Sequence, residues 1–311
     1  MSSGFGGPVQ RLLRRDRPAP DRRTPSVAVL TVARDEKVML PRWIDHYGRE
    51  FGTDHLIVFD DNSSDGSTDD LPCTVHRIPG FPPGKFEGSR MRLVSGVARG
   101  LLETYDVVMF TDVDELIVAD PARHDGLLDL LRARPDAQVL APLALNVVHH
   151  AASEAPLDPD LPVAGQRHFA VFAPVMCKPA IKRVPDNWAI ASHGVRHPYS
   201  VDPDLFMLHL KFADRDLLRA AADRRHAMVQ VDKRGANTSW SRTGNDIVSV
   251  MERVAAGIDP EAVSEFDPSS IDLESLVTRA EKAWRSRPEG QIKALTTHPV
   301  VRIPERLHGL V

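Results

Sequence analysis

Two aspartates stand one residue apart in the segment FTDVDEL, residues 110–116, at the end of an apolar run. Carboxylates this close, Asp112 and Asp114, repel each other, which raises the pKa of at least one of them unless a cation lies between them. Mg²⁺ and Mn²⁺ prefer oxygen ligands and typically bind one or two carboxylates together with phosphate oxygens. The pair therefore indicates a site for a metal-bound diphosphate, although acids that only cap the turn after a strand have the same pattern.

Charged side chains also follow two earlier apolar runs. The segment TVARDE places Arg34 and Glu36 where a polar group can hydrogen-bond a base or ribose, and where a guanidinium can bind phosphate through two parallel hydrogen bonds. The segment FDDNSSDGSTDD offers Asp60 or Asp61 as an acceptor for a ribose hydroxyl or an imino N–H. The alternatives are structural, because acids at a helix start complement the helix dipole and the second segment suits an Asx-type turn.

Alternating strands and helices must position these residues. Short apolar runs predict strands at 27–33, 55–60, 74–78 and 106–111. The helical spacing of apolar residues predicts helices over 37–51 and 91–101. This alternation is typical of an open α/β sheet with mostly parallel strands flanked by helices, in which ligands bind at the carboxyl ends of the strands. We therefore expect the three charged clusters to meet at one edge of the sheet.

The second half of the chain has a weaker pattern. Strands are expected at 139–148, 168–176 and 205–212, and helices at 126–135, 213–229, 247–256 and 273–285. The sequence predicts three parts, which are a disordered basic tail over 1–25, an α/β domain over 26–235 and a helical C-terminal extension over 236–311.

Composition excludes several classes of protein. Hydrophobic residues make up 42% of the chain and charged residues 26%, which excludes a wholly disordered chain, a collagen-like repeat and a coiled coil. The 39 basic residues against 43 acidic ones disfavour a protein that coats nucleic acid. Two cysteines exclude a disulfide scaffold and fit a reducing cytosol. We expect no transmembrane segment and no secretory signal.

The first 25 residues carry six arginines, at positions 11, 14, 15, 17, 22 and 23. Such a tail can contact an anionic membrane surface. We therefore expect a cytoplasmic protein, with peripheral contact at the inner membrane face through this tail.

The run from Val27 to Val118 resembles family 2-type glycosyltransferases of the GT-A fold. The subgroup concerned has the pattern hRNE…W…H…G…hhhhDNxSxDG…DxDEF. The chain offers ARDE at 33–36, then Trp43, His46 and Gly52, then FDDNSSDG at 59–66 and DVDEL at 112–116. It departs from the pattern at Asp35, where Asn is usual, and at Leu116, where Phe is usual. Neither departure removes an expected metal ligand.

The resemblance implies a GT-A-like catalytic domain and a metal-dependent glycosyltransferase of the hexosyltransferase type (EC 2.4). Such an enzyme moves a sugar from a nucleotide diphosphosugar, most often a UDP-sugar, to an acceptor hydroxyl. Mn²⁺ or Mg²⁺ is the implied cofactor and inversion the implied stereochemistry. The acceptor, whether glycan, lipid or small molecule, cannot be read from the sequence, and the loops at 152–165 and 232–246 are expected to select it.

The resemblance also assigns site residues. It places Arg34, Glu36 and Asp60 or Asp61 near the nucleoside, and Lys85 and Arg90 toward the donor. Asp112 would lie near the ribose and the metal, and Asp114 would bind the metal. In the subgroup a late histidine lies near the diphosphate, often in an H-x-K-like run. His209 and Lys211 match that spacing and share one strand face, so that His209 can be a third metal ligand and Lys211 can neutralise the leaving diphosphate.

Inversion requires a carboxylate base beside the acceptor hydroxyl. We select Asp186, in VPDNW, over three other acids, namely Asp202, Asp204 and Asp214. His193 is a further candidate for a donor or acceptor contact, and Trp240 for stacking on a sugar or aromatic acceptor.

Two other functions stay open. A haloacid dehalogenase-type phosphatase would use Asp112 and Asp114, but its motif normally lies on the first strand, whereas here two strand–helix units precede it. A non-catalytic nucleotide-sugar-binding protein could share the fold, although the presence of both aspartates argues against it.

Overall fold

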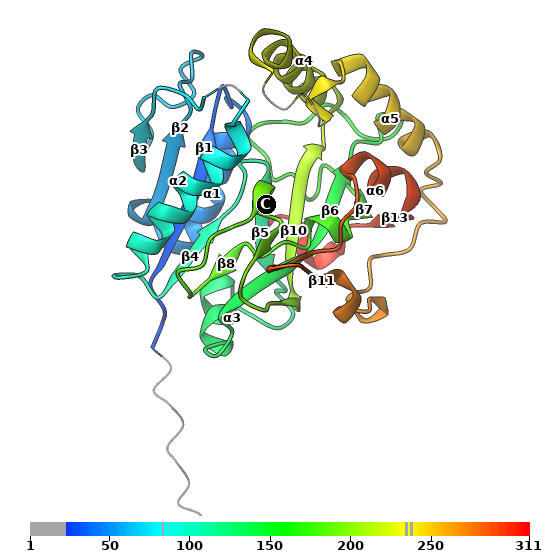
Figure 1. The fold of residues 1–311 in the computed structure, drawn as a ribbon. Helices are drawn as coiled ribbons and strands as arrows, with labels where there is room; N and C mark the ends of the chain where they lie inside the picture. Colours follow the sequence, from blue (N-terminus) through cyan, green and yellow to red (C-terminus); the bar gives the residue numbers. More distant parts are fainter. Residues whose placement is uncertain (1–22, 83, 234–235, 237–238) are drawn as a thin grey trace, which may run out of the picture.

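The computed structural model describes residues 23–82, 84–233, 236 and 239–311. Within this part of the chain, a ten-stranded sheet has the order β13-β7-β6-β8-β4-β1-β2-β3, and β10 pairs with both β5 and β6 (Figure 1). The strands are β1 (Val27–Ala33), β2 (Leu56–Asp60), β3 (Thr74–Arg77), β4 (Val107–Phe110), β5 (Glu115–Ala119), β6 (Val139–Val148), β7 (Phe169–Phe172), β8 (Ile181–Lys182), β10 (Ser200–Phe212) and β13 (Val300–Arg302). The basic tail predicted over 1–25 lies almost wholly outside the described residues.

The last four strands in this order, β4-β1-β2-β3, are parallel, with Val29 of β1 opposite Leu56 of β2 and Val27 opposite Val107 of β4. Beyond β4 the neighbouring strands pair antiparallel, except that β10 runs parallel to β6. The predicted open α/β sheet of mostly parallel strands flanked by helices is confirmed for the strands β3-β2-β1-β4.

The helices are α1 (Met39–Phe51), α2 (Phe86–Leu101), α3 (Leu127–Ala133), α4 (Arg215–Asp232), α5 (Gly244–Ala256) and α6 (Gln291–Thr297). Helix α1 buries its apolar stripe against the parallel strands and ends at Gly52, whose φ of 88° favours glycine. Trp43 Nε1 donates to Thr111 Oγ1 at 2.8 Å, and Tyr47 OH donates to the carbonyl oxygen of Glu115 at 3.0 Å. Helix α1 thereby ties the segment between β4 and β5 in place.

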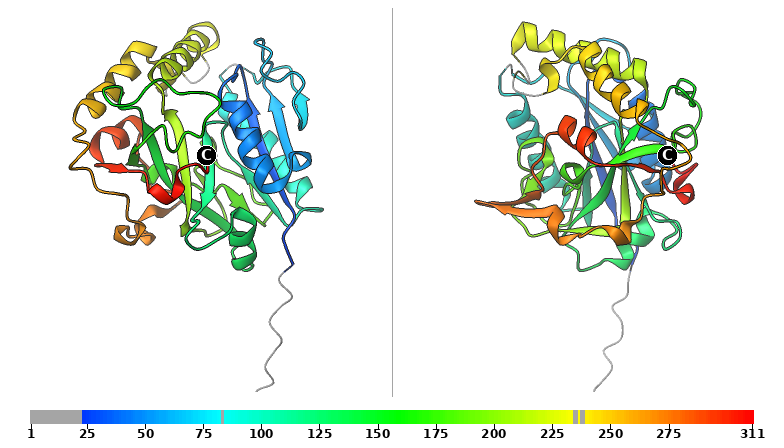
Figure 2. Two further views of the ribbon diagram at one scale, coloured as in Figure 1. Left: turned by 180° about the vertical axis from the view of Figure 1, so that it is seen from behind. Right: turned by 90° about the vertical axis from the view of Figure 1, so that its right-hand side faces the viewer.

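Helices α4 and α5 lie at the end of the sheet where β10 terminates, in Figure 1 and in both views of Figure 2. Leu218 of α4 and Ile247 and Met251 of α5 belong to a second hydrophobic cluster, separate from the main core. The two helices stand on either side of the predicted domain boundary at 235/236, which stays a prediction.

One helix prediction is wrong. The stretch 273–285 forms a short 3₁₀ turn followed by β11 (Val277–Ala280) and β12 (Ala283–Ser286), and β12 pairs with β9 (Gly194–Val195). A two-residue turn with Glu281 at a φ of 46° joins the two strands. Pairing with β9, which is distant in sequence, therefore outweighs the helical spacing. The sequence analysis also did not anticipate β5, and the strand expected over 168–176 ends at Phe172.

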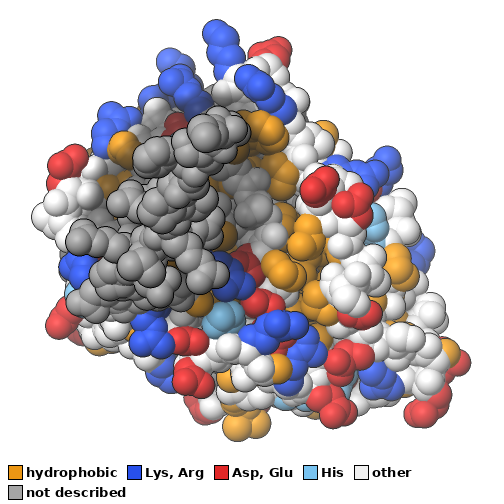
Figure 3. All heavy atoms as spheres, turned by 90° about the horizontal axis from the view of Figure 1, so that it is seen from below, with side chains coloured by type: hydrophobic (Ala, Val, Ile, Leu, Met, Phe, Trp, Pro, Cys, Tyr) orange, Lys and Arg blue, Asp and Glu red, His pale blue; other side chains and the backbone are white. Residues whose placement is uncertain are grey.

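No described helix is both long and apolar enough to span a bilayer. On the face seen in Figure 3, acidic and basic side chains lie intermixed over the described part of the surface. This mixture agrees with the small net charge of −4.

Candidate active site

A cavity of about 840 Å³ opens at the carboxyl ends of β1 and β4, next to β10 and beneath α4. It brings together eight of the residues predicted for the site, which are Arg34, Glu36, Asp61, Arg90, Asp112, Asp114, His209 and Lys211. The charged clusters therefore meet at one edge of the sheet, as the alternation of strands and helices predicts. His193 and Trp240 line the same cavity.

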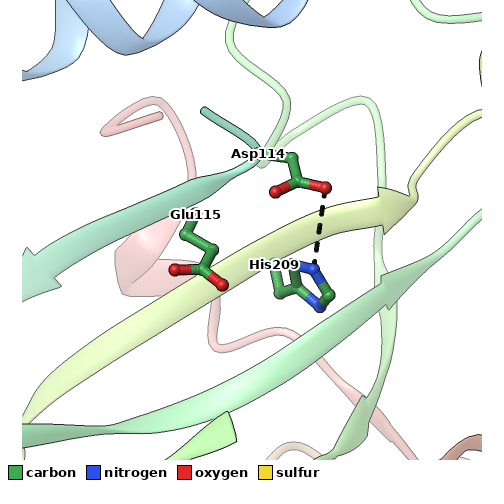
Figure 4. Close-up of side chains that lie close together, drawn as sticks. All are labelled: Asp114, Glu115 and His209. Atoms are coloured by element: carbon green, nitrogen blue, oxygen red, sulfur yellow. Dashed lines mark ion pairs between the residues drawn. The ribbon is translucent and has the colours of Figure 1, made fainter. Parts of the chain in front are cut away.

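Three side chains in this cavity form a cluster with metal-ligand chemistry (Figure 4). Ligand atoms of Asp114, Glu115 and His209 lie within 4.8 Å of one another. Two carboxylates and an imidazole fit a divalent cation such as Mn²⁺. The structure groups Glu115, rather than the predicted Asp112, with Asp114 and His209.

The orientation of His209 supports this fit. Its Nδ1 lies 2.6 Å from Oδ1 of the buried Asn146, which accepts, so the ring proton resides on Nδ1. The lone pair on Nε2 then faces Asp114 Oδ2 at 3.7 Å. Burial lowers the pKa of His209 to about 4, so the ring is neutral near pH 7. Two electron pairs that face each other in this way leave a position suited to a cation.

Asp112 lies beside two cations. Its Oδ1 accepts from Arg90 at 2.5 Å, and its Oδ2 lies 3.9 Å from Lys178 Nζ. Loss of solvent contact alone would raise the pKa of Asp112, but Arg90 and Lys178 outweigh it and hold the pKa well below its usual range. Asp112 is therefore ionised at neutral pH.

Lys178 and Glu115 form a buried ion pair under the cavity, with 2.7 Å between Lys178 Nζ and Glu115 Oε1. Burial raises the pKa of Glu115 to about 7 in spite of the neighbouring Lys178. The sequence analysis did not select either residue. One signal in the sequence could have indicated Lys178, which directly follows an apolar run that ends at Met176 and Cys177. A lysine next to such a run is expected to be buried, and a buried lysine almost always has an acidic partner.

Among the residues predicted to lie near the nucleoside, Arg34 and Asp61 are neighbours, with 3.8 Å between Arg34 NH1 and Asp61 Oδ2. Asp61 Oδ1 accepts from the Phe81 N–H at 2.8 Å, which orients the carboxylate. Burial raises the pKa of Glu36 to about 7, so near neutral pH this carboxyl can donate or accept a hydrogen bond.

Three predicted residues do not lie among the described residues that line the cavity. Asp60 is buried and accepts hydrogen bonds from Ser63, Thr68 and Arg77, so it stabilises the turn after β2. Lys85 is exposed at the start of α2. Asp186 accepts from the backbone N–H groups of residues 187 and 197, which makes it a turn residue rather than a base at the cavity.

His193 and Trp240 are held in place by other parts of the chain. His193 Nδ1 lies 2.8 Å from the Val175 carbonyl oxygen and 3.1 Å from Ser286 Oγ. The ring centroid of Trp240 lies 5.3 Å from that of Phe86, so an aromatic contact spans the cavity between α2 and the segment after α4.

The sequence matches no protein-family model and no curated protein. Among solved structures, it is similar to a mannosyltransferase from Pyrobaculum calidifontis in complex with GDP-Man and Mn²⁺, at 22% identity over 43% of this chain and 39% of that chain, with a TM-score of 0.26. Glucosyl-3-phosphoglycerate synthase from Mycobacterium tuberculosis matches at 18% identity over 39% and 44% of the two chains, with a TM-score of 0.27. The mannosyltransferase Ktr4p from S. cerevisiae matches at 14% identity over 45% and 44%, with a TM-score of 0.24. The chain thus spans less than half the length of each of these proteins.

Proposed function

We propose that the protein is a metal-dependent glycosyltransferase with a GT-A-like catalytic domain, which transfers a sugar from a nucleotide diphosphosugar to an acceptor hydroxyl. The observation that carries this proposal is the meeting of Asp112, Asp114 and His209 with Arg34 and Asp61 around one cavity of about 840 Å³. One end of this group suits a nucleoside and the other suits a metal-bound diphosphate.

Donor binding follows from the chemistry of each group. Asp61 can accept from a ribose hydroxyl, and Arg34 beside it can bind a phosphate through two hydrogen bonds. Glu36, with its pKa near 7, can present either a donor or an acceptor to the base. The family 2 relationship and the choice of a UDP-sugar are parts of this proposal.

Asp114 and His209 would hold the metal, with Glu115 or Asp112 as a further ligand, and Mn²⁺ or Mg²⁺ is the proposed ion. When bound, such an ion stabilises the negative charge that develops on the leaving diphosphate.

Sugar transfer breaks the bond between the anomeric carbon and a phosphate oxygen, so positive charge develops on the sugar and negative charge on the diphosphate. Lys211 lines the cavity and opposes that negative charge. Burial, followed by the repulsion of Arg225, lowers the pKa of Lys211 to about 8, which leaves it mostly protonated at pH 7. We propose inversion, with a base other than Asp186, because that residue does not reach the cavity.

The phosphatase alternative is not favoured. Two strand–helix units precede β4, and Asp112, the nucleophile of that alternative, is held by Arg90 at 2.5 Å. The binding-protein alternative predicts nucleotide binding without any turnover of the donor.

We further propose a cytoplasmic location, with contact at the inner membrane face through the basic residues of the N-terminal segment. Residues 1–22 of that segment lie outside the described residues. Co-sedimentation with vesicles of anionic and of neutral lipid, with and without residues 1–25, tests this contact.

A thermal-shift panel tests the proposed function. UDP, GDP, CDP and dTDP are each added with Mn²⁺ or with EDTA, and a ligand at about 100 times its Kd stabilises by roughly 2.7 kcal/mol. We expect one nucleotide to stabilise the protein only with Mn²⁺, and Asp114→Asn to lose that effect. Asp45→Asn, an exposed change on α1, is the matched control. Absence of stabilisation by all four nucleotides contradicts the proposal, and release of nucleotide from the matching sugar donor separates an enzyme from a binding protein.

A further inference from the structure

Helix α4 presents one face to the cavity. Ala221, Arg224, Arg225 and Met228 all line it, and they follow the i, i+3, i+4, i+7 spacing of a single helical face. The adjoining side of α4 carries the buried apolar residues Leu218 and Ala222, which belong to one hydrophobic cluster with residues of α5. The hydrophobic packing therefore fixes the rotation of α4 and directs two adjacent arginines toward the cavity.

These two arginines differ from Arg34, Arg90 and Lys178 of the same cavity, each of which has an acidic partner. Within the described part of the chain, neither Arg224 nor Arg225 forms an ion pair. In the same cavity Arg90 pairs with Asp112 at 2.5 Å, and Lys178 pairs with Glu115 at 2.7 Å. The charge of the cavity floor is thus largely balanced, whereas that of α4 is not.

Aromatic contacts position Arg225 over the cavity. Its guanidinium carbon lies 5.7 Å from the ring centroid of Trp240, which suits a cation–π contact. The Trp240 ring in turn lies 5.3 Å from that of Phe86 on α2. The contacts from Phe86 through Trp240 to Arg225 connect the two walls of the cavity.

Glu36 is the carboxyl whose ionisation both arginines favour. Burial nevertheless raises the pKa of Glu36 to about 7, so near neutral pH it supplies only part of a negative charge. Two guanidinium groups therefore line the cavity, and Glu36 offsets their charge only in part. A cavity with such an excess of one charge attracts ligands of the other sign.

We propose that Arg224 and Arg225 bind a phosphate group of a substrate in this cavity. Guanidinium groups match phosphate oxygens through paired, charge-assisted hydrogen bonds, and two of them can share one phosphate or span a diphosphate. This proposal rests on the proposed function, because the phosphate would belong either to the diphosphate of the sugar donor or to a phosphorylated acceptor.

Calorimetric titration with pyrophosphate in EDTA at fixed ionic strength tests this site without the metal and without turnover. Arg224→Gln and Arg225→Gln keep the length of the side chain and remove its charge. We expect each to weaken pyrophosphate binding by at least about tenfold. Arg253→Gln, an exposed change on α5 outside the cavity, is the control and should bind as the wild type does. Urea unfolding of each variant verifies that it is folded.

The proposal is overturned if the wild-type protein does not bind pyrophosphate in EDTA, or if all three variants bind it with equal affinity. Nucleosides, nucleoside diphosphates and inorganic phosphate then identify the source of the phosphate. In the first outcome, the arginine variants bind the nucleoside diphosphate no more tightly than the nucleoside, and the arginines then bind the diphosphate of the donor. In the second outcome, the variants still bind the nucleoside diphosphate more tightly than the nucleoside, but inorganic phosphate no longer binds to the nucleotide-saturated protein. The arginines then bind a phosphate of the acceptor.

Failure of the proposed function gives a different result. In that case no nucleotide stabilises the protein and no donor is turned over, while pyrophosphate binding still depends on Arg224 and Arg225.

Discussion

Replacement of Asn146 by alanine tests whether the orientation of His209 prepares the metal site. Asn146 Oδ1 lies 2.6 Å from His209 Nδ1, and both side chains are buried. Alanine leaves a buried imidazole N–H without an acceptor, which costs about 1–3 kcal/mol of unfolding free energy. The ring is then free to carry its proton on Nε2, the atom that faces Asp114.

The affinity for the metal is expected to fall as well, by a free energy similar to the loss in folding. Loss of a group that orients a metal-binding histidine typically lowers metal affinity by about 10–100-fold. Asn146→Asp keeps an acceptor toward Nδ1 and removes the amide Nδ2, a buried atom that lacks a partner within the described structure. We therefore expect Asn146→Asp to retain Mn²⁺ binding within a few-fold of the wild-type value.

Mn²⁺ binding is measured by electron paramagnetic resonance of the free ion, and stability by urea unfolding with Asn187→Ala as an exposed control. The reasoning is refuted if Asn146→Ala binds Mn²⁺ as tightly as the wild type does. It is also refuted if Asn146→Asp loses as much affinity as Asn146→Ala, because the acceptor would then have no role in orienting the ring.

Three further predictions concern residues of the fold and the cavity. Asp60→Ala should lower the unfolding free energy by about 1–3 kcal/mol and leave the nucleotide preference unchanged, whereas Asp61→Ala should weaken nucleotide binding, as urea unfolding and titration of the preferred nucleotide would show. Lys178→Met should lower the unfolding free energy by about 3–5 kcal/mol at pH 8, because it leaves Glu115 buried without its partner. Adding Glu115→Gln should recover part of that loss, and the ion pair is contradicted if the losses of the two single variants simply add in the double variant. Burial lowers the pKa of His46 from 6.5 to about 4, so the contribution of its neutral ring to stability is complete above pH 6.5 and is lost as the pH falls through 4. The His46→Gln variant should therefore lose up to about 3 kcal/mol less unfolding free energy than the wild type between pH 6.5 and pH 4, as urea unfolding across that range would show.

The parallel half of the sheet could be predicted from the chain because its signals are local. Each of β1, β2 and β4 is a short apolar run, and α1 carries its apolar residues at helical spacing. In a parallel sheet the carboxyl ends share one edge, so the charged residues after these strands had to converge. Arg34, Asp112 and Asp114, which follow different strands, therefore line one cavity, as the alternation of strands and helices predicts.

The prediction failed where long-range pairing decides the structure. The stretch 273–285 has helical spacing, yet β12 pairs with β9, about 90 residues earlier in the chain. Asp60 and Asp61 are neighbours in a strand end and point to opposite faces, so the sequence cannot tell which of them faces the cavity. In the structure Asp60 accepts a hydrogen bond within the turn after β2, whereas Asp61 lines the cavity.

The sequence by itself determined the kind of sheet, the edge at which ligands bind and the acidic motif at that edge, because these depend on residue type and spacing within one element. Only the tertiary structure decided which charges remain unpaired. Lys178 reaches Glu115 and Arg90 reaches Asp112 from segments far apart in the chain, whereas α4 turns Arg224 and Arg225 toward the cavity without an acidic partner among the described residues. The energy of a buried charge depends on the atoms within a few ångströms of it, and those neighbours are set by folding.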